Sequence, residues 1–260
     1  GGLGGGIAGS PDDGSGPSSG RWKLPAAQAE DPAEDPAEAR AATSGNMQNR
    51  NLTLRLEVLS AAPEGPRIFL IKNLLSDYEA DHLIEVSRGR VKRSMTGQAE
   101  SAYVSTTRTS KNGWVDRAAS PVVERLFRRA ADLLRLDEAI LTHEKISGNA
   151  ELLQVVHYDP DQKYDGHHDW GVENGGPTRY ITLLLYLNDP VKGGQTAFPK
   201  TEGTGGQPIA LHPGKGSAVL FYNLLPDGNT DVDTLHAALP VIEGEKWLAN
   251  FWIWDPIMTW

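Results

Sequence analysis

The sequence contains no cysteine among its 260 residues. Disulfide bonds, thiolate ligation of zinc or of iron–sulfur clusters, and a cysteine nucleophile are therefore excluded. The chain also has no excess of positive charge, since its formal net charge is −9, and this argues against nucleic acid as its main partner. No apolar run is long enough to span a bilayer, the longest being residues 181–187 with one threonine among them. These absences predict an acidic globular protein without a membrane span.

The first part of the chain has no periodic apolar pattern. Residues 1–20 are rich in glycine, with scattered serine, aspartate and proline, and residues 26–42 contain a near-repeat of Glu-Asp-Pro-Ala. Such a segment has too little apolar surface to offset its ordering entropy. We therefore predict a disordered Gly/Pro/Ala/acidic tail or linker over residues 1–48 and a folded domain over residues 49–260. The chain begins with glycine rather than methionine, which predicts a fragment or a processed form.

Hydrophobic periodicity predicts two helices in the first half of the folded domain and mainly strands in the second half. Ser76 and Glu79 form a capping-box pattern that begins a helix ending near residue 87, and Ser120-Pro121 begins another ending near residue 136. The expected strands cover residues 52–58, 67–72, 151–158, 180–187, 217–222 and 246–254. A doubly wound parallel sheet would need a helix after nearly every strand. The pattern instead predicts a mainly β fold with flanking helices (α+β), a double-sheet jelly roll with helices backing one sheet.

Two His-x-Asp pairs could each offer an imidazole and a carboxylate to one metal ion. Residues i and i+2 of a strand point to the same face, so both His157/Asp159 and His167/Asp169 are candidates. Two histidines and one carboxylate form the facial ligand set of non-haem Fe(II) oxygenases, and the third ligand would come from elsewhere in the chain. The spacing alone leaves both pairs open. His168 lies between the second pair and is expected to face away from the metal.

Three stretches of the second half occur in a distinctive order. They are residues 180–188 (YITLLLYLN), residues 193–198 (GGQTAF), and residues 233–241 (DTLHAALPV) followed by 244–247 (GEKW). With the preceding His-x-Asp, they closely resemble the prolyl 4-hydroxylase family of 2-oxoglutarate- and Fe(II)-dependent dioxygenases. The resemblance spans residues 67–255. It implies a double-stranded β-helix core and makes residues 49–260 a catalytic domain.

The resemblance also implies which residues hold iron and 2-oxoglutarate. The implied iron ligands are His167, Asp169 and His236. Lys246 matches the lysine that pairs with the distal carboxylate of 2-oxoglutarate, a role suited to a buried ammonium because an unpaired buried carboxylate is costly. Tyr158 and Thr196 match positions whose hydroxyls bond the same carboxylate, so the run containing His157 and Asp159 is expected to contribute a co-substrate contact and not the metal pair.

Four further positions match residues that line the peptide groove of the family: Glu151, Tyr164, Arg179 and Trp252. Tyr164 and Trp252 could stack on a proline ring, an apolar surface that aromatic faces grip well. The chain departs from the family at Trp254, where many members have histidine or arginine. It is also short between Asp169 and Arg179 and between residues 198 and 216, two stretches that are expected to be loops over the site. These departures concern peptide contacts rather than the chemistry.

The function implied by the resemblance is hydroxylation of peptidyl proline at C4 with O₂ and 2-oxoglutarate, releasing succinate and CO₂. Ascorbate is the implied reductant of oxidised iron. The nearest alternative is another target, either lysine or a proline of a ribosomal or translation-factor protein. A non-catalytic peptide-binding module and hydrolytic zinc chemistry are alternatives of other classes, and Asp169 disfavours a halogenase.

The resemblance also bears on partners and compartment. The implied partner is a proline-containing peptide or protein, with no nucleic acid, and the oligomeric state is left open. The implied compartment is the lumen of the endoplasmic reticulum or Golgi, with the cytoplasm as the alternative.

Overall fold

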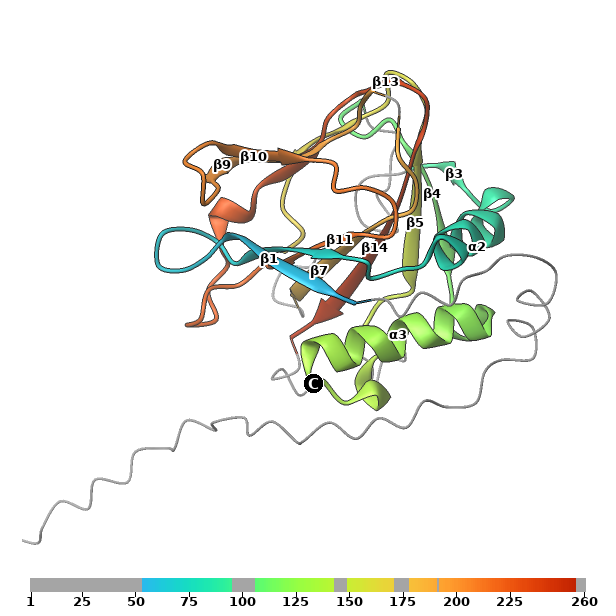
Figure 1. The fold of residues 1–260 in the computed structure, drawn as a ribbon, viewed down its shortest axis with the longest axis horizontal. Coiled ribbons are helices and arrows are strands. Elements are labelled where there is room, and N and C mark those ends of the chain that lie inside the picture. Colours follow the sequence, from blue (N-terminus) through green and yellow to red (C-terminus); the bar gives the residue numbers. More distant parts are fainter. Residues whose placement is uncertain (1–52, 95–105, 143–148, 171–177, 191, 256–260) are drawn as a thin grey trace, which may run out of the picture. The chain divides into compact units, whose positions relative to one another are not determined.

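The computed structural model describes residues 53–94, 106–142, 149–170, 178–190 and 192–255 (Figure 1). The predicted tail and its boundary after residue 48 lie outside these residues. The helices and 3₁₀ turns are α2 (Asp77–Arg88), η1 (Arg117–Ala119), α3 (Pro121–Leu134), η2 (Glu138–Ile140) and η3 (Val232–Thr234). The strands are β1 (Arg55–Ser60), β2 (Ile68–Lys72), β3 (Lys92–Arg93), β4 (Lys111–Val115), β5 (Leu153–Tyr158), β6 (Tyr164–His167), β7 (Arg179–Tyr186), β8 (Lys192–Gly193), β9 (Thr196–Glu202), β10 (Pro208–Leu211), β11 (Ala218–Tyr222), β12 (His236–Ala238), β13 (Val241–Glu243) and β14 (Lys246–Trp254).

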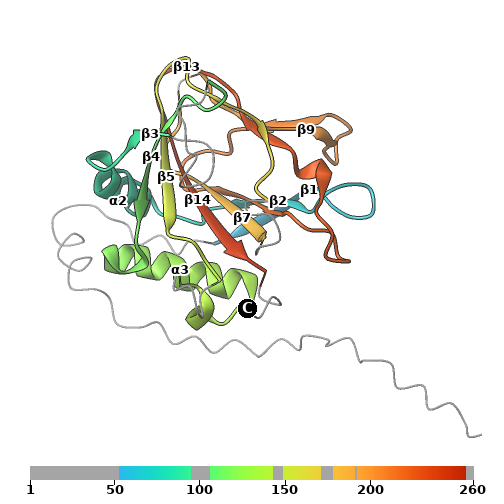
Figure 2. The ribbon, with the colours of Figure 1, turned by 180° about the vertical axis from the view of Figure 1, so that it is seen from behind.

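The strands form a large and a small sheet that face each other, as expected for a jelly roll. The large sheet has eight strands in the order β1-β2-β11-β7-β14-β5-β4-β3, and the small one has four in the order β10-β9-β12-β6. Strands β13 and β8 make a separate pair. Figures 1 and 2 show β9 and β10 on one side of the large sheet and α3 on the other. The predicted fold class, a mainly β jelly roll with helices backing the major sheet, is confirmed.

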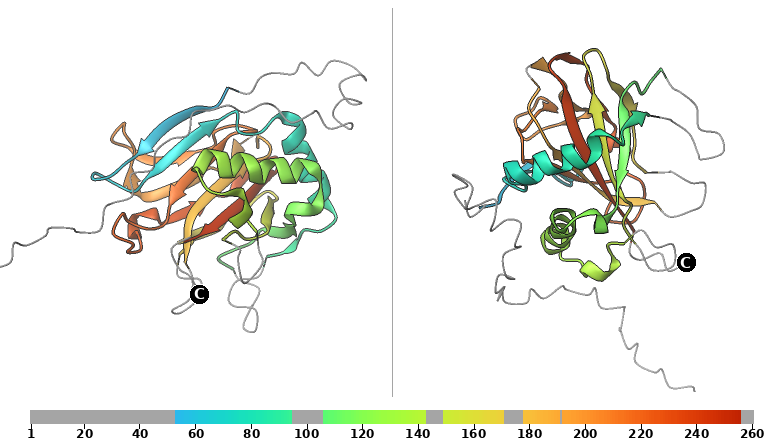
Figure 3. Two further views of the ribbon diagram at one scale, coloured as in Figure 1. Left: turned by 90° about the horizontal axis from the view of Figure 1, so that it is seen from below. Right: turned by 90° about the vertical axis from the view of Figure 1, so that its right-hand side faces the viewer.

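The two helices begin where the sequence predicts, each at a serine cap. The Ser76 hydroxyl accepts a hydrogen bond from the backbone N–H of Glu79, whose carboxylate accepts one from the backbone N–H of Ser76 in return. Helix α3 begins at Pro121, and Ser120 caps it by accepting from the N–H of Val123. Both helices lie across the outer face of the large sheet (Figure 3).

Alternation along β14 separates two environments. Trp247 and Phe251 belong to the apolar core between the large sheet and the helices, where the Phe251 ring lies 4.4 Å from that of Phe127 in α3. Asn250 and Trp252 instead line a cavity between the two sheets. Because successive side chains of a strand point to opposite faces, the odd-numbered residues 247–253 of β14 pack against the helices, and Leu248, Asn250 and Trp252 face the cavity.

The predicted long strands match the observed ones closely, and the predicted first strand is shifted towards residue 60. Strands β3, β4, β6, β8, β9, β10, β12 and β13 were not predicted, and most of them are short or only partly buried. The expectation of a loop between residues 198 and 216 was wrong, because this stretch contains most of β9 and all of β10. Within the described residues, no helix has both the length and the apolar character needed to cross a membrane. The predicted loop between residues 169 and 179 falls mostly on residues that the structure does not describe.

Candidate metal and co-substrate site

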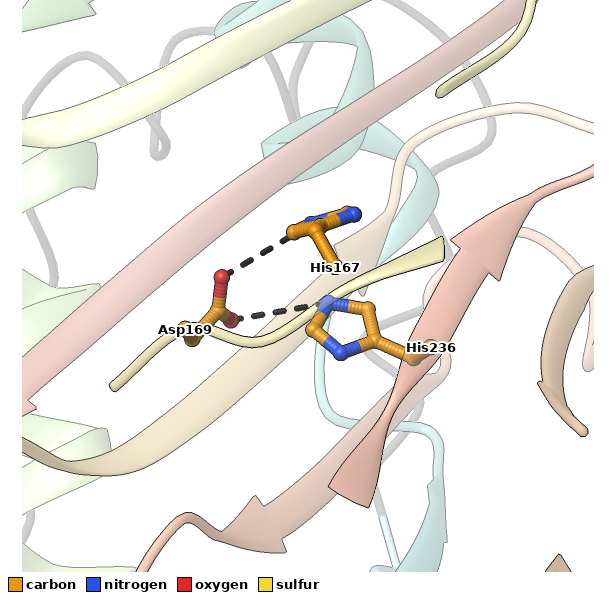
Figure 4. A group of neighbouring side chains, drawn as sticks. All are labelled: His167, Asp169 and His236. Atoms are coloured by element: carbon orange, nitrogen blue, oxygen red, sulfur yellow. Dashed lines mark ion pairs between the residues drawn. The ribbon is translucent and has the colours of Figure 1, made fainter. Parts of the chain in front are cut away.

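Three side chains that could hold a metal ion meet between the two sheets (Figure 4). His167 ends β6 and His236 begins β12, and the two are direct cross-strand partners in the small sheet. Asp169 follows two residues after His167. The three ligand atoms lie within 4.8 Å of one another, with His167 Nε2 3.8 Å from Asp169 Oδ1 and His236 Nε2 3.6 Å from Asp169 Oδ2. The structure therefore brings together the three residues that the sequence singled out as iron ligands.

Backbone contacts leave Nε2 of both imidazoles available as a ligand atom. Nδ1 of His167 lies 2.9 Å from the carbonyl oxygen of Asp165, and Nδ1 of His236 lies 3.0 Å from that of Thr234. A carbonyl can only accept, so in the neutral rings each Nδ1 carries the proton and donates it, and Nε2 keeps its lone pair. This arrangement is typical of metal-binding histidines.

The carboxylate of Asp169 is held from behind by the large sheet. Its Oδ2 accepts hydrogen bonds from Thr182 Oγ1 at 2.8 Å and from the indole Nε1 of Trp252 at 3.0 Å. Thr182 in turn accepts from the side-chain amide of Asn223 at 2.9 Å. These bonds use Oδ2 and fix the plane of the carboxylate, so Oδ1 remains for an ion.

The protonation states at this cluster suit a cation. Burial lowers the pKa of His167, and the neighbouring His236 lowers it further. Burial alone would raise the pKa of Asp169, but the imidazoles of His236 and His167 outweigh it and bring the pKa below its usual value. At neutral pH the cluster thus offers a neutral imidazole at His167 and an ionised carboxylate, the forms in which these groups bind metals.

The other His-x-Asp pair is directed elsewhere. His157 lies on the outer face of β5, where its ring stacks on Trp247 and its Nε2 lies 2.7 Å from the carboxylate of Glu245. Asp159 accepts a hydrogen bond from Lys111 at 2.7 Å. Neither residue is part of the ligand cluster, and His168 bonds the carbonyl of Val232 at 3.0 Å.

A cavity of about 430 Å³ opens over the cluster. Among the residues predicted to bind co-substrate or peptide, its lining includes Tyr158, Thr196, Tyr164, Arg179 and Trp252. Its wall also includes all three metal-ligand candidates. The structure therefore places the predicted metal ligands and most of the predicted binding residues around one space.

Lys246 lies behind one wall of this cavity, fully buried. Its Nζ donates a hydrogen bond to the carbonyl of Gly194 at 2.7 Å and lies 3.5 Å from Thr196 Oγ1. Among the residues that the structure describes, no carboxylate pairs with this ammonium, and burial lowers its pKa to about 7. A buried ammonium without a carboxylate partner is costly, so this end of the site is suited to an anion.

Two tyrosines flank the lysine, and the sequence singled out only one of them. Tyr158 is buried, which raises the pKa of its phenol to about 12, and its ring centre lies 5.5 Å from Lys246 Nζ. Tyr186 had no predicted role, yet its hydroxyl donates to Thr196 Oγ1 at 2.6 Å and its ring centre lies 5.6 Å from the same nitrogen. The sequence contains little signal for it: Tyr186 lies four residues after Thr182, on the same face of a predicted strand that is otherwise almost wholly apolar.

Three of the four predicted peptide-binding residues, Glu151, Arg179 and Trp252, form one connected group. Arg179 makes a two-pronged ion pair with Glu151, at 2.9 Å between Nη2 and Oε2, and its guanidinium carbon lies 3.6 Å above the ring centre of Trp252. Trp252 is only 5% exposed, so its ring packs against Arg179 as well as bonding Asp169. The large exposed aromatic beside it is Trp114 of β4, at a ring distance of 6.2 Å.

Tyr164 covers the metal-ligand cluster on one side. Its ring stacks on that of His167 with the centres 3.6 Å apart. Arg108 also contacts the Tyr164 ring, with its guanidinium carbon 4.7 Å from the ring centre. Nη2 of Arg108 donates a hydrogen bond to Gln154 Oε1 at 3.0 Å. Arg108 was missed by the sequence reading because a single arginine before a short strand carries no periodic signal.

Comparisons with known proteins agree with this geometry. Residues 153–254 match the model of the 2OG-Fe(II) oxygenase superfamily. A probable prolyl 4-hydroxylase 6 of Arabidopsis thaliana is 37% identical over 211 residues, which cover 72% of this chain and 69% of the relative. Prolyl 4-hydroxylase subunit alpha-1 of Gallus gallus is 35% identical over 198 residues, but these cover only 36% of that longer protein.

Solved structures show the same likeness. The viral collagen prolyl hydroxylase of Paramecium bursaria Chlorella virus-1, solved as a 2-oxoglutarate complex, is 27% identical with a TM-score of 0.56, over 75% of this chain and 99% of that one. A prolyl 4-hydroxylase of Pseudomonas putida shares the fold with a TM-score of 0.53 at 20% identity.

Proposed function

Because the chain belongs to the prolyl 4-hydroxylase family of Fe(II)- and 2-oxoglutarate-dependent dioxygenases, we propose that it hydroxylates peptidyl proline at C4. The products would be the hydroxylated peptide, succinate and CO₂. The observation that carries the proposal is the His167–Asp169–His236 cluster on the wall of a cavity that Thr196 also lines. Lys246 lies buried behind Thr196 and has no carboxylate partner among the described residues.

In this proposal Fe(II) is held by His167, Asp169 and His236. The donor set fits the ion, since each imidazole has its Nδ1 bound to a carbonyl and its Nε2 free, and the carboxylate is ionised. Fe(II) bound here would activate O₂ as the oxidant: one oxygen atom would convert a C–H bond of proline to C–OH, and the other would enter succinate as 2-oxoglutarate is oxidised and loses CO₂. The hydrogen bonds from Thr182 and Trp252 hold Asp169 in place throughout.

The distal carboxylate of 2-oxoglutarate would be bound by Lys246, with the hydroxyls of Tyr158 and Thr196 as additional donors. An anion bound beside Nζ would give the buried ammonium a charged partner, which it does not have among the described residues. Tyr186 fixes the hydroxyl of Thr196 by donating to it. Because the pocket is buried, the pairing excludes water and is correspondingly strong.

The peptide would lie over Tyr164 and the group formed by Arg179, Glu151 and Trp252. Glu151 occupies Nε and Nη2 of Arg179, so Nη1 is the guanidinium nitrogen directed to a peptide carbonyl in this proposal. Aromatic surface at Tyr164 suits a proline ring. An extended, proline-rich ligand is pre-ordered and loses little entropy on binding.

Anaerobic and aerobic incubations of the Fe(II)-loaded protein with a proline-rich peptide test the proposal. We expect succinate formation and a peptide mass gain of one oxygen atom, both requiring O₂ and 2-oxoglutarate, with the new hydroxyl at C4. Peptides with lysine in place of proline test the alternative target. A product formed without O₂ would contradict the proposal and indicate hydrolytic chemistry.

Tyr164→Ala sharpens the test of the substrate. We expect weaker peptide binding, while succinate release without peptide persists, because all metal-ligand and co-substrate side chains remain and His167, although it loses the stacked ring, keeps its bond to the Asp165 carbonyl. Free proline is expected to be a poor substrate. If free proline were turned over as fast as a proline-rich peptide, the peptidyl assignment would fall and the oxygenase chemistry would stand.

Two further parts of the proposal rest on the family alone. Ascorbate is proposed as the reductant of oxidised iron, so omitting it should make turnover decline with time. The compartment is proposed to be the lumen of the endoplasmic reticulum or Golgi. Imaging of the tagged full-length protein tests that location, and a purely cytoplasmic signal would contradict it.

A further inference from the structure

Lys246 lies at the end of β14 where the regular backbone pairing with β7 has stopped. The backbone of β14 pairs with β7 from Trp254 to Leu248, and the N–H of Leu187 extends this by donating to the carbonyl of Trp247 at 3.0 Å. After Asn188 the neighbouring chain reaches Pro190, which has no N–H to donate. On this side, the peptide groups around Lys246 therefore have no regular strand as partner.

The side chain of Asn188 fills this gap. Its Oδ1 accepts a hydrogen bond from the backbone N–H of Trp247 at 2.6 Å, and its Nδ2 donates to the carbonyl oxygen of Glu245 at 2.8 Å. These two groups belong to the residues directly before and after Lys246. A side-chain amide has an acceptor and a donor on two different atoms, as a peptide group has, so it can replace a peptide group of a missing strand; an ionised carboxylate has no donor and cannot.

The lysine itself needs such support. Its four-carbon side chain is flexible, and its described hydrogen-bonding contacts at Nζ are the carbonyl of Gly194 and the hydroxyl of Thr196. Gly194 has a φ of +71°, and a Cβ at this position would lie 3.4 Å from Lys246 Cδ. Lys246 Nζ therefore reaches the Gly194 carbonyl only when the backbone segments at residues 246 and 194 keep their positions relative to each other.

We propose that Asn188 is a positioning residue for Lys246: by bridging Glu245 and Trp247, it sets the backbone from which the ammonium reaches the distal carboxylate of 2-oxoglutarate. The inference rests on the proposed role of Lys246 and goes beyond it, since Asn188 itself touches neither co-substrate nor metal in this scheme. Its effect should therefore be confined to ligands that have a distal carboxylate.

Two ligands separate this role from a general structural one. 2-Oxoglutarate and 2-oxobutyrate share the keto acid group, but only 2-oxoglutarate has the distal carboxylate. Calorimetric titration of the Fe(II)-loaded protein without O₂ measures both affinities and needs no turnover. We expect Asn188→Ala to weaken 2-oxoglutarate binding about tenfold, the order expected from losing two backbone contacts, and to leave 2-oxobutyrate binding unchanged.

A double-mutant cycle with Lys246→Ala makes the coupling explicit. Lys246→Ala alone should weaken 2-oxoglutarate binding by about a hundredfold or more. In that background, Asn188→Ala should produce no further loss, because there is no ammonium left to position. Additive losses, or equal losses for both ligands, would overturn the proposal.

The outcomes also separate this inference from the proposed function. If Lys246→Ala left 2-oxoglutarate binding intact, the assignment of the anchor would fall and the role of Asn188 with it. If Lys246→Ala weakened binding and Asn188→Ala did not, only the positioning role would fall.

Two variants control for stability. Val123→Ala removes buried apolar atoms from α3 on the opposite side of the sheet and should lower the melting temperature without a change in either affinity. Asn188→Asp is nearly isosteric and keeps an acceptor for Trp247, but it loses the donor to Glu245. It should reproduce the selective loss of 2-oxoglutarate affinity even if Asn188→Ala folds poorly.

Discussion

The two faces of the large sheet are made by the same strands but contain different kinds of residue. On the outer face, β7, β11 and β14 present apolar side chains to α2 and α3, and this core is continuous. On the inner face, β7 and β14 present the polar side chains of Thr182, Lys246 and Asn250 beside a smaller apolar cluster to which β11 also contributes. Burial is nearly complete on both sides, so the faces differ in chemistry and not in exposure.

This difference shows how a small domain keeps polar groups in its interior. The inner polar groups are almost all paired: Asp169 accepts from Thr182 and Trp252, and Gln154 accepts from Asn250 and Arg108. Unpaired buried polar groups cost stability, which the outer face must offset. The outer face therefore has the larger apolar core, and the inner face combines a smaller apolar cluster with the paired polar groups of the site.

The largest expected effect comes from removing one inner ligand. His236→Ala should abolish turnover and weaken Fe(II) binding, because three protein ligands are already few for this ion. The fold should persist, since His236 contributes little apolar packing to the outer core. Peptide mass analysis and metal titration measure the two effects. Loss of iron binding in His157→Ala with retention in His236→Ala would reverse the assignment.

On the outer face, Phe251→Ala should act on stability alone. Truncating this fully buried ring beside Phe127 should lower the free energy of unfolding by about 3–5 kcal/mol. Denaturant unfolding measures the loss, and turnover per folded molecule should be retained at low temperature. A selective rise in the Michaelis constant for 2-oxoglutarate would show that the two faces are not separable.

The third prediction compares two tryptophans of β14 that lie on opposite faces of the large sheet, Trp252 and Trp247. Trp252→Phe removes the indole N–H that holds Asp169 and keeps an aromatic ring beneath Arg179, so Fe(II) affinity should fall about tenfold. Trp247→Phe is the control, because the Trp247 indole N–H is buried on the outer face without a hydrogen-bond partner in the described structure. Equal effects of both variants on iron affinity would contradict the prediction.

The smallest expected effect is on the pH dependence of stability, through Glu79 of helix α2. Burial would raise the pKa of Glu79, but its hydrogen bonds and charge interaction with Arg129 lower the pKa below the ordinary 4.5. A carboxylate whose pKa is lower in the folded state stabilises the fold above pH 4.5, and this stabilisation is lost as the pH falls through the folded-state pKa.

Glu79→Gln should therefore flatten the acid side of the stability profile by about 1 kcal/mol. Melting temperatures of the metal-free wild type and variant between pH 6 and pH 3, roughly the range in which carboxylates titrate, measure the difference. Turnover at neutral pH should be unchanged. Parallel profiles for the two proteins would show that the Arg129 pair contributes nothing.

The sequence predicted the outer face better than the inner one. The long strands 180–187 and 246–254 and the capped helices have strong local signals, and the order of His167, Asp169, His236 and Lys246 follows the family pattern. The strands β6 and β12, which carry the two histidines, have three or four residues each and were not predicted. They exist because of long-range pairing, which leaves no local periodicity.

Contacts between residues that are far apart in the sequence could not be predicted from it either. The bond from Trp252 to Asp169 joins residues 83 apart, and that from Asn188 to Trp247 joins residues 59 apart. Trp252 was predicted to contact peptide, and nothing in its neighbourhood indicated that its indole would hold the carboxylate. Such contacts depend on which strands become neighbours, a property of the whole sheet rather than of any segment.

The direct pairing of His167 with His236 has a consequence for how this gene can change. Opposite residues of an antiparallel pair have a spacing set by the backbone, so the distance between the two imidazoles does not depend on the lengths of the loops among β7 to β11, the strands that separate β6 from β12 in the chain. Loops that come after Asp169 can gain or lose codons and leave the three ligands in place. A single inserted codon within either strand, by contrast, turns every later side chain to the other face. Insertions and deletions among natural descendants should therefore occur mainly between the strands. The three residues of β12 should tolerate substitution of an amino acid more readily than insertion of one.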